Sequence, residues 1–268
     1  MFDFSPILNW KLLAGSHDFP GPDGGTCINE VAVVAAGFAY REITSPEDCP
    51  PCFSRVLSAY ALSLNDRIPG EALRNELLMP FVARLAGSAD SEAVEEARAR
   101  HIVGAIVRQI LPPALDRRGL FDLAFICRAA VTPGEARKAI SEVVSLVRKL
   151  ALRYDDIVRN FDDPLILIAD TLEDLAREAD LGSWGRSHVM LRVGDLPHYA
   201  GQVLDRTRGS NEGMRSSLAA AAGILAEAFE IGKKSGSISE RAVASRFNKA
   251  KQEGRKRASE IHASLQAA

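Results

Sequence analysis

The sequence predicts an all-α protein, a multi-helix globular bundle with a loop rich in glycine and proline near its N-terminus. Apolar residues recur at helical spacing along most of the chain, whereas the strict alternation of a half-buried strand is almost absent. Aromatic residues make up only 6% of the 268 residues. Alanine and leucine provide most of the apolar character, a bias that favours helices over sheets.

Before residue 112 the apolar spacing predicts four helices, at approximately residues 27–37, 53–64, 71–85 and 91–111. Thr26 is the predicted N-cap of the first helix, because its hydroxyl can accept a hydrogen bond from a backbone N–H. Pro80 should bend or split the third helix, since proline lacks a backbone donor and clashes with the preceding turn. Pro112 and Pro113 should end the fourth helix, and we place a domain boundary near residue 115.

Beyond this boundary, helices are predicted at approximately residues 121–131, 133–158, 164–181 and 214–229. A basic terminal helix should begin near Ser239 or Glu240. Glycine, proline and histidine interrupt residues 182–209, which we predict to be an ordered loop with a short strand at 189–193. The predicted organisation is an N-terminal helical domain at 1–115, a second helical region at 116–235 and a basic C-terminal helix at 236–268.

Several common classes of protein are disfavoured by what the sequence lacks. No apolar run reaches the ~18 residues that a membrane span needs. The segment Met1–Trp10 carries Asp3 and no basic residue, unlike a signal peptide. We therefore expect a cytoplasmic protein with no membrane partner, whose four cysteines are thiols or metal ligands. Phosphate-binding Gly-x-x-x-x-Gly-Lys loops, dinucleotide fingerprints and Gly-x-Ser-x-Gly elbows are also absent from the sequence.

Charge is distributed unevenly along the chain. The formal net charge is -2, but residues 233–268 contain nine Lys or Arg against three Glu. A solvated terminal helix is the ordinary reason for such a pattern. Nucleic-acid binding is the alternative, and it would use the basic residues Arg241, Arg246, Lys249, Lys251, Arg255, Lys256 and Arg257.

Three of the four cysteines lie in the first 52 residues, together with a histidine and a glutamate. Residues 15–27 contain four glycines and two prolines, a composition that allows tight turns and can bring His17 back to the first helix. Cys27 and Glu30 are three residues apart and should lie side by side on that helix. Asp48 can cap the next helix, which would place both cysteines of the Cys-Pro-Pro-Cys segment at 49–52 in its first turn.

This cluster predicts a structural zinc site, since zinc favours four thiolate or imidazole ligands. The predicted ligands are His17, Cys27, Cys49 and Cys52, with Glu30 as a possible replacement for one of them. Three other interpretations stay open. Cys27 can be a small core residue on an apolar stripe, the Cys-Pro-Pro-Cys segment can be a redox dithiol, and a cysteine paired with His17 can act as a nucleophile.

The cluster also carries a resemblance. Gly-Ser-His at 15–17, Pro-Gly-Pro-Asp-Gly-Gly-Thr-Cys-Ile-Asn-Glu at 20–30 and Cys-Pro-Pro-Cys at 49–52 resemble a bacterial family of uncharacterised proteins. The resemblance extends from Gly15 to about Leu111 and brings no known activity with it. It implies that the residues of one connected site are His17, Cys27, Glu30 and Cys52.

Taken together, these patterns predict a helical protein that binds a protein partner and whose N-terminal loop is pinned by the cysteine and histidine cluster. Zinc is the one cofactor that the cluster suggests. The alternative is an enzyme that uses His17, Cys27, Glu30 and Cys52, with metal-activated water or a thiolate as the reacting group. An open coordination position or a deep pocket beside Cys27 would favour the enzyme.

Overall fold

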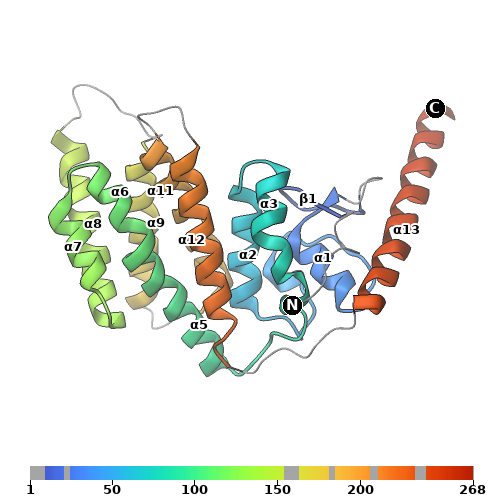
Figure 1. The fold of residues 1–268 in the computed structure, drawn as a ribbon, viewed down its shortest axis with the longest axis horizontal. Helices are drawn as coiled ribbons and strands as arrows, with labels where there is room; N and C mark the ends of the chain where they lie inside the picture. Colours follow the sequence, from blue (N-terminus) through green and yellow to red (C-terminus); the bar gives the residue numbers. More distant parts are fainter. Residues whose placement is uncertain are drawn as a thin grey trace. The chain divides into compact units, whose positions relative to one another are not determined.

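The computed structural model describes residues 10–20, 25–153, 163–180, 185–205, 211–232 and 240–267. These residues are mostly helical, and their strands are limited to two short segments, which confirms the predicted all-α class (Figure 1). Contacts divide the chain into two compact units. The first combines residues 1–91 with 232–268, and the second is formed by residues 92–231.

The predicted organisation differs from this division in two respects. The expected boundary near residue 115 falls inside helix α6 (Leu111–Arg117), which contacts other helices of the second unit. The basic terminal helix, expected as a separate part, belongs to the first unit because it packs against the first helix of the chain. The first unit is therefore discontinuous in sequence.

The first unit contains a pair of two-residue parallel strands, one 3₁₀ turn between the first two helices and a second between α3 and α4. Its elements are β1 (Lys11–Leu12), β2 (Gly25–Thr26), α1 (Ile28–Ala35), a 3₁₀ turn (Pro46–Asp48), α2 (Arg55–Arg67), α3 (Glu71–Leu78), a 3₁₀ turn (Met79–Phe81), α4 (Val82–Leu85) and α13 (Glu240–Ala267). The split at Met79–Phe81 confirms the prediction for Pro80, which lies in the 3₁₀ turn between α3 and α4.

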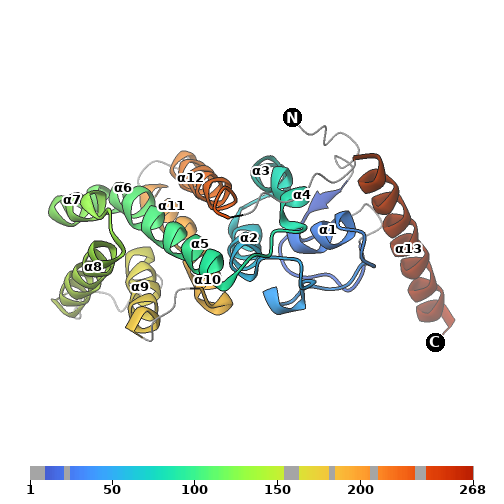
Figure 2. The same cartoon turned by 90° about the horizontal axis from the view of Figure 1, so that it is seen from below.

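Helix α1 is the centre of the first unit. All of its residues are buried, and it contacts α2, α4 and α13. Figure 2 shows α13 on one side of α1, with α2 and α4 on the other. A helix that is apolar nearly all round is typical of such a central position. The polar groups that α1 does bury therefore need partners inside the unit.

The strand β1 is fixed on its outer edge by α3. The buried Arg74 guanidinium donates hydrogen bonds to the carbonyls of Leu12, Asn65 and Ile68 at 2.9, 2.6 and 2.7 Å. The side-chain oxygen of Asn75 accepts from the Leu12 N–H at 2.9 Å. The bonds to Leu12 satisfy backbone groups that a two-stranded sheet leaves unpaired, and the bonds to Asn65 and Ile68 satisfy carbonyls at the end of α2.

Helix α13 completes the core of the first unit. The buried ring of Phe247 lies against that of Trp10, with 4.5 Å between centroids. Arg246 donates a hydrogen bond of 2.6 Å to the Ala35 carbonyl, where α1 ends and carbonyls lack helical partners. Gly254 lies so close to Pro20 that a Cβ atom would sit 2.4 Å from the Pro20 carbonyl oxygen. Only glycine fits at this position without a backbone shift.

The second unit is a set of packed helices. Its elements are α5 (Glu92–Ala105), a π turn (Ile106–Ile110), α6 (Leu111–Arg117), α7 (Phe121–Ala129), α8 (Pro133–Arg153), α9 (Pro164–Asp180), α10 (Ser187–Val193), α11 (Leu196–Asp205) and α12 (Glu212–Ala228). Helix α11 contacts α6, α9 and α12, and α8 contacts α9. The residues 154–158 of the long predicted helix lie outside the described residues.

We expected Pro112 and Pro113 to end the fourth predicted helix, but the helical path continues through them. Pro112 and Pro113 instead occupy the start of α6, where a backbone donor is not required. The turn before them has π geometry at Ile106–Ile110, which changes the hydrogen-bond register ahead of the missing donors. The chain therefore continues helically through this point.

The prediction of a loop with a strand at 182–209 is wrong for the described part of that segment. Ser187–Val193 forms α10 and Leu196–Asp205 forms α11. Gly201, which suggested irregular structure, lies inside α11 where a Cβ atom would be 2.8 Å from the backbone of Met214. This glycine allows α11 and α12 to approach closely and does not interrupt the helix.

Among the described residues no helix combines the length and apolar character of a membrane span.

Candidate functional site

The start of α1 is built by a reciprocal cap between Cys27 and Glu30. The Cys27 sulfur accepts a hydrogen bond from the Glu30 N–H at 3.5 Å, and the Glu30 carboxylate accepts from the Cys27 N–H at 2.8 Å. Cys27 is therefore the N-cap, and the prediction of Thr26 is wrong by one residue. Thr26 lies instead in β2, where its carbonyl accepts from the Leu13 N–H.

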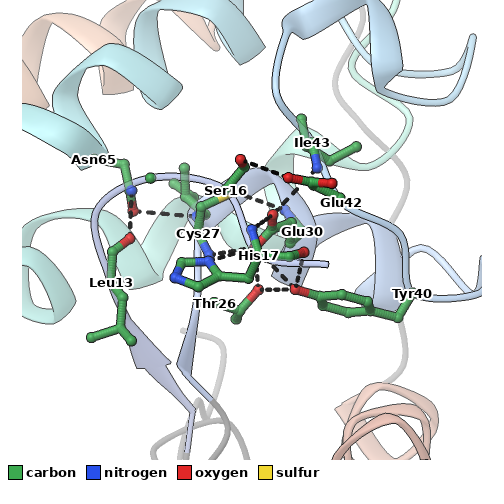
Figure 3. A network of polar contacts seen from close by, with 12 residues as sticks. Leu13, Ser16, His17, Thr26, Cys27, Glu30, Tyr40, Glu42, Ile43 and Asn65 are labelled. Carbon is green, nitrogen blue, oxygen red and sulfur yellow. Dashed lines mark hydrogen bonds and ion pairs between the residues drawn. The ribbon is translucent and has the colours of Figure 1, made fainter. Parts of the chain in front are cut away.

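The Glu30 side chain is the hub of the site. It has no exposed surface, and Figure 3 shows polar groups converging on its carboxylate from several segments. The groups within hydrogen-bonding distance are the N–H of His17 (2.7 Å), Nδ1 of His17 (3.1 Å), the Thr26 hydroxyl (2.7 Å), the Cys27 N–H (2.8 Å), the Tyr40 hydroxyl (3.1 Å) and the Ile43 N–H (3.3 Å). One carboxylate thus joins the loop before β2, the start of α1 and the segment after it.

The electrostatics of this hub favour an ion pair. Burial alone would raise the pKa of Glu30, but hydrogen bonds from His17, the Cys27 N–H and Thr26 outweigh burial and hold the pKa below its ordinary value of 4.5. The hydrogen bond to Glu30 raises the pKa of His17 above its ordinary value of 6.5, although partial burial opposes the change. Glu30 is therefore charged at neutral pH, and its charge favours the protonated form of the His17 ring that faces it.

The loop that carries His17 is held at further points. The Gly15 N–H donates to Asp66 at 2.8 Å, and the Asn65 side chain donates to the Leu13 carbonyl at 2.7 Å. Asn65 also accepts from the Ile28 N–H at 3.3 Å. The end of α2 and the start of α1 thus fix the same loop.

The thiols near this hub are poorly suited to nucleophilic chemistry. Burial raises the pKa of the Cys27 thiol well above its ordinary value, and the neighbouring Glu30 charge adds to the effect. Burial also raises the pKa of Cys49 to about 11. Since the thiolate is the nucleophile, these two cysteines are protonated and unreactive near neutral pH. Cys52 is partly exposed and its thiol is free.

The Cys-Pro-Pro-Cys segment was predicted to lie in the first turn of a helix, and this prediction is wrong. Asp48 caps the short 3₁₀ turn by accepting hydrogen bonds from the N–H groups of Thr44 and Ser45. Helix α2 begins later, at Arg55, with Ser54 as its N-cap. The segment 49–52 therefore belongs to the connection between the two elements and lacks the helix N-terminus that activates a redox dithiol.

The predicted zinc ligands His17, Cys27, Cys49 and Cys52, with Glu30, are not brought together as one site. Among the described residues no group of three or more His, Cys, Asp or Glu side chains is arranged to hold a metal ion. The local contacts give the reason. Glu30 and Nδ1 of His17 bind each other, and the Cys27 sulfur caps α1. Of the implied connected site, Glu30 contacts both His17 and Cys27.

The residues predicted to bind nucleic acid lie on α13. Arg246 and Arg257 contact other segments of the first unit. Arg246 bonds the Ala35 carbonyl. Arg257 lies 3.6 Å from the Asp18 carboxylate and 5.2 Å from the Phe19 ring centroid. Lys249 and Lys256 are largely exposed and make long ion pairs with glutamates one turn further along α13. Of the remaining basic residues of the predicted set, Arg241 and Arg255 are exposed and Lys251 is half-buried.

Sequence reasoning missed three members of the hub: Thr26 as a side-chain donor, Tyr40 and the Ile43 N–H. The pattern of a reciprocal helix cap, a polar residue followed three positions later by glutamate, marks Cys27 as the N-cap and Glu30 as its partner, but it does not identify these three groups. Tyr40 and Ile43 lie in irregular chain, and no periodic pattern marks them.

Comparison of the chain with protein-family models, curated proteins and solved structures finds no match. The resemblance to an uncharacterised bacterial family therefore stays a prediction. Conclusions about function rest on the geometry of this chain.

Proposed function

We propose that the chain is a helical protein that binds a protein partner through the C-terminal half of α13. The observation that carries this proposal is an apolar stripe on α13 that continues beyond the part of the helix that is packed. Its buried members are Val243, Phe247, Ala250 and Gly254. The stripe then continues at the same helical spacing through Ala258, Ile261 and Leu265, which we call the distal stripe.

The distal stripe is an unusual place for large apolar side chains. Ile261 is 42% exposed and Leu265 is 72% exposed. Single exposed apolar residues are common, but two that extend an existing core stripe in register favour a surface that a partner covers. Figure 1 shows α13 continuing beyond its contact with α1 toward its C-terminal end.

The Glu30 hub supports this surface through a chain of contacts in the first unit. Glu30 fixes His17, and the residues that follow His17 in the loop contact α13 midway along its length. Asp18 and Phe19 contact Arg257, and the Pro20 backbone lies against Gly254. The hub thus pins the loop, and the loop fixes the direction of α13 immediately before the distal stripe.

The enzyme alternative receives less support. A thiolate is disfavoured because burial keeps the Cys27 and Cys49 thiols protonated. The Glu30 carboxylate is surrounded by donors, so it has no lone pair directed at a substrate. The hub is suited to hold structure together.

Site-specific photocrosslinking in the native cell tests the proposal. A benzoylphenylalanine is introduced at position 261 of the full chain, and the matched control carries it at position 256. Lys256 is also on the exposed half of α13, but its side chain points about 140° away around the helix. We expect a discrete crosslinked protein from position 261 and none of that mass from position 256. Equal products from both positions, or none from either, would contradict the proposal.

A further inference from the structure

The chemistry of the distal stripe points to one kind of occupant, and the inference that follows rests on the proposed function. We infer that the partner supplies an acidic amphipathic helix that lies along α13 beside Ala258, Ile261 and Leu265. Shape, charge and the exclusion of other occupants support it.

The shape of the stripe favours a helix. Its members are spaced three and four residues apart on one face of a straight helix, so they form a narrow row and not a pocket. A second helix with its own apolar row can place side chains between them, as in helix-in-groove recognition. Ala258 is small and lets the partner backbone approach, while Ile261 and Leu265 supply the apolar area.

The charge beside the stripe favours acidic residues on the partner. Arg255 lies on one flank of the row, about 90° around α13 from its centre and three residues before Ala258, and the half-buried Lys251 lies one turn further toward the N-terminus. From Lys249 to the end of α13 there are five Lys or Arg against two Glu. Carboxylates on the partner helix would meet this flank, and complementary charge also increases the association rate.

Two other occupants fit less well. A second copy of the chain would bring an equally basic α13 against the first, so like charges would face each other across the contact. A nucleic acid would use the cations but gains nothing from exposed isoleucine and leucine, and among the described residues of α13 the one Phe, Tyr or Trp ring, that of Phe247, is buried.

The test selects binders without assuming a partner sequence. A phage-displayed library of helical peptides with randomised surfaces is selected on the full-length protein. We expect the enriched peptides to share an apolar stripe and a net negative charge. For the best of them, the Ile261→Asp/Leu265→Asp variant should bind at least about tenfold more weakly, because both changes place a charge in the apolar contact.

Matched charge variants test the electrostatic part. Arg255→Glu should weaken binding of the selected peptide by roughly threefold to tenfold, whereas Lys256→Glu, further from the stripe, should change it less than twofold. Circular dichroism confirms that each variant keeps the fold, as expected for exposed positions. Peptides of neutral or positive net charge, or acidic peptides insensitive to Ile261→Asp/Leu265→Asp, would overturn the inference.

Further outcomes separate this inference from the proposed function. A dimer in light scattering that dissociates on Ile261→Asp would place a second copy on the stripe and overturn the acidic helix. Tight binding of a single-stranded oligonucleotide that survives Ile261→Asp/Leu265→Asp would likewise favour nucleic acid. If position 261 crosslinks to a protein while the selected peptides are not acidic, the proposed function stands and only this inference fails.

Discussion

Glu30 carries a negative charge where water does not reach, and the surrounding donors make that charge tolerable. Replacing Glu30 with glutamine keeps the size but turns one oxygen into a donor group, which must face the N–H groups of His17, Cys27 or Ile43. We expect Glu30→Gln to lower the free energy of unfolding by about 3 kcal/mol, because a broken buried network leaves polar groups unpaired.

Urea unfolding monitored by circular dichroism measures this change. The control is Glu42→Gln, since Glu42 is exposed and, within the described part of the chain, accepts a hydrogen bond only from the Ser16 hydroxyl, at 3.0 Å. That variant should differ from the wild type by less than about 0.5 kcal/mol. Equal effects of the two substitutions would contradict the role assigned to Glu30.

The ion pair between His17 and Glu30 should make stability depend on pH in both directions. The pKa of His17 is raised on folding, so its contribution is complete below pH 6.5 and is lost as the pH rises through the folded value. The pKa of Glu30 is lowered, so its contribution is complete above pH 4.5 and is lost as the pH falls through the folded value. The pair should therefore contribute most between about pH 4.5 and 6.5.

The comparison of wild type with His17→Gln isolates this contribution. We expect the difference in the free energy of unfolding between the two proteins to be largest near pH 5.5 and to shrink at pH 8 and above. A difference that is constant from pH 5 to pH 9 would show that the His17 charge does not stabilise the fold.

At the scale of elements, the packing of α13 against the loop that contains Pro20 depends on Gly254. Alanine normally stabilises a helix relative to glycine by about 1 kcal/mol. At Gly254 a Cβ atom would lie 2.4 Å from the Pro20 carbonyl oxygen, so Gly254→Ala must displace either the loop or α13. We expect it to destabilise the first unit and to increase amide exchange in the N–H groups of α1.

Gly223 in α12 is the matched control, because a Cβ atom there would meet nothing within 4 Å. Gly223→Ala should be neutral or stabilising by up to about 1 kcal/mol. The sign of the two effects, measured by thermal unfolding and hydrogen exchange, distinguishes a close backbone contact from a helix with an ordinary glycine. Stabilisation by both substitutions would mean that Pro20 and Gly254 are not in close contact.

Helix positions were predictable wherever the apolar period extends over several turns. The 3.6-residue pattern from 133 onward gives α8, and Pro80 marks the break between α3 and α4. The failures have a common cause, since one residue type can serve opposite purposes. Gly201 lies within a helix for close packing, and Pro112 begins a helix where we expected an end. Local sequence does not distinguish these uses, because the deciding contact is distant.

The candidate site was predictable only where its members are close in sequence. Glu30 lies one turn after Cys27, and the glycine-rich loop returns His17 to the same place. The donors from Tyr40 and Ile43 depend on how an irregular segment folds back on α1. The separation of Cys49 from the hub likewise depends on where α2 begins, which the Ser54 cap decides.

For the whole molecule, the division into units predicts how fragments behave. The second unit is continuous from 92 to 231. Arg98, near its start, contacts Glu95 at 2.7 Å and also the carbonyl of its last residue, Ile231, at 3.1 Å, so the two ends of the unit are joined. We expect the fragment 92–231 to be helical and to unfold cooperatively by circular dichroism. The fragment 1–91 lacks α13 and should not unfold cooperatively, because Trp10 loses the Phe247 ring that covers it.

Joining 1–91 to 240–268 through a short flexible linker provides the complementary measurement. That protein should recover a cooperative transition if the first unit is correctly assigned. A fragment 92–231 without a cooperative transition would contradict the division.

The pairing of Trp10 with Phe247 also determines the order in which the protein can be built on the ribosome. Trp10 and α1 are synthesised before the second unit, but the helix that covers them is synthesised after it. The second unit is complete before then, so it can fold first although it comes later in sequence. A translation product that stops short of Phe247 leaves the apolar side of α1 open to chaperones and proteases. The first unit can therefore complete its core only after the whole of the second unit has been synthesised.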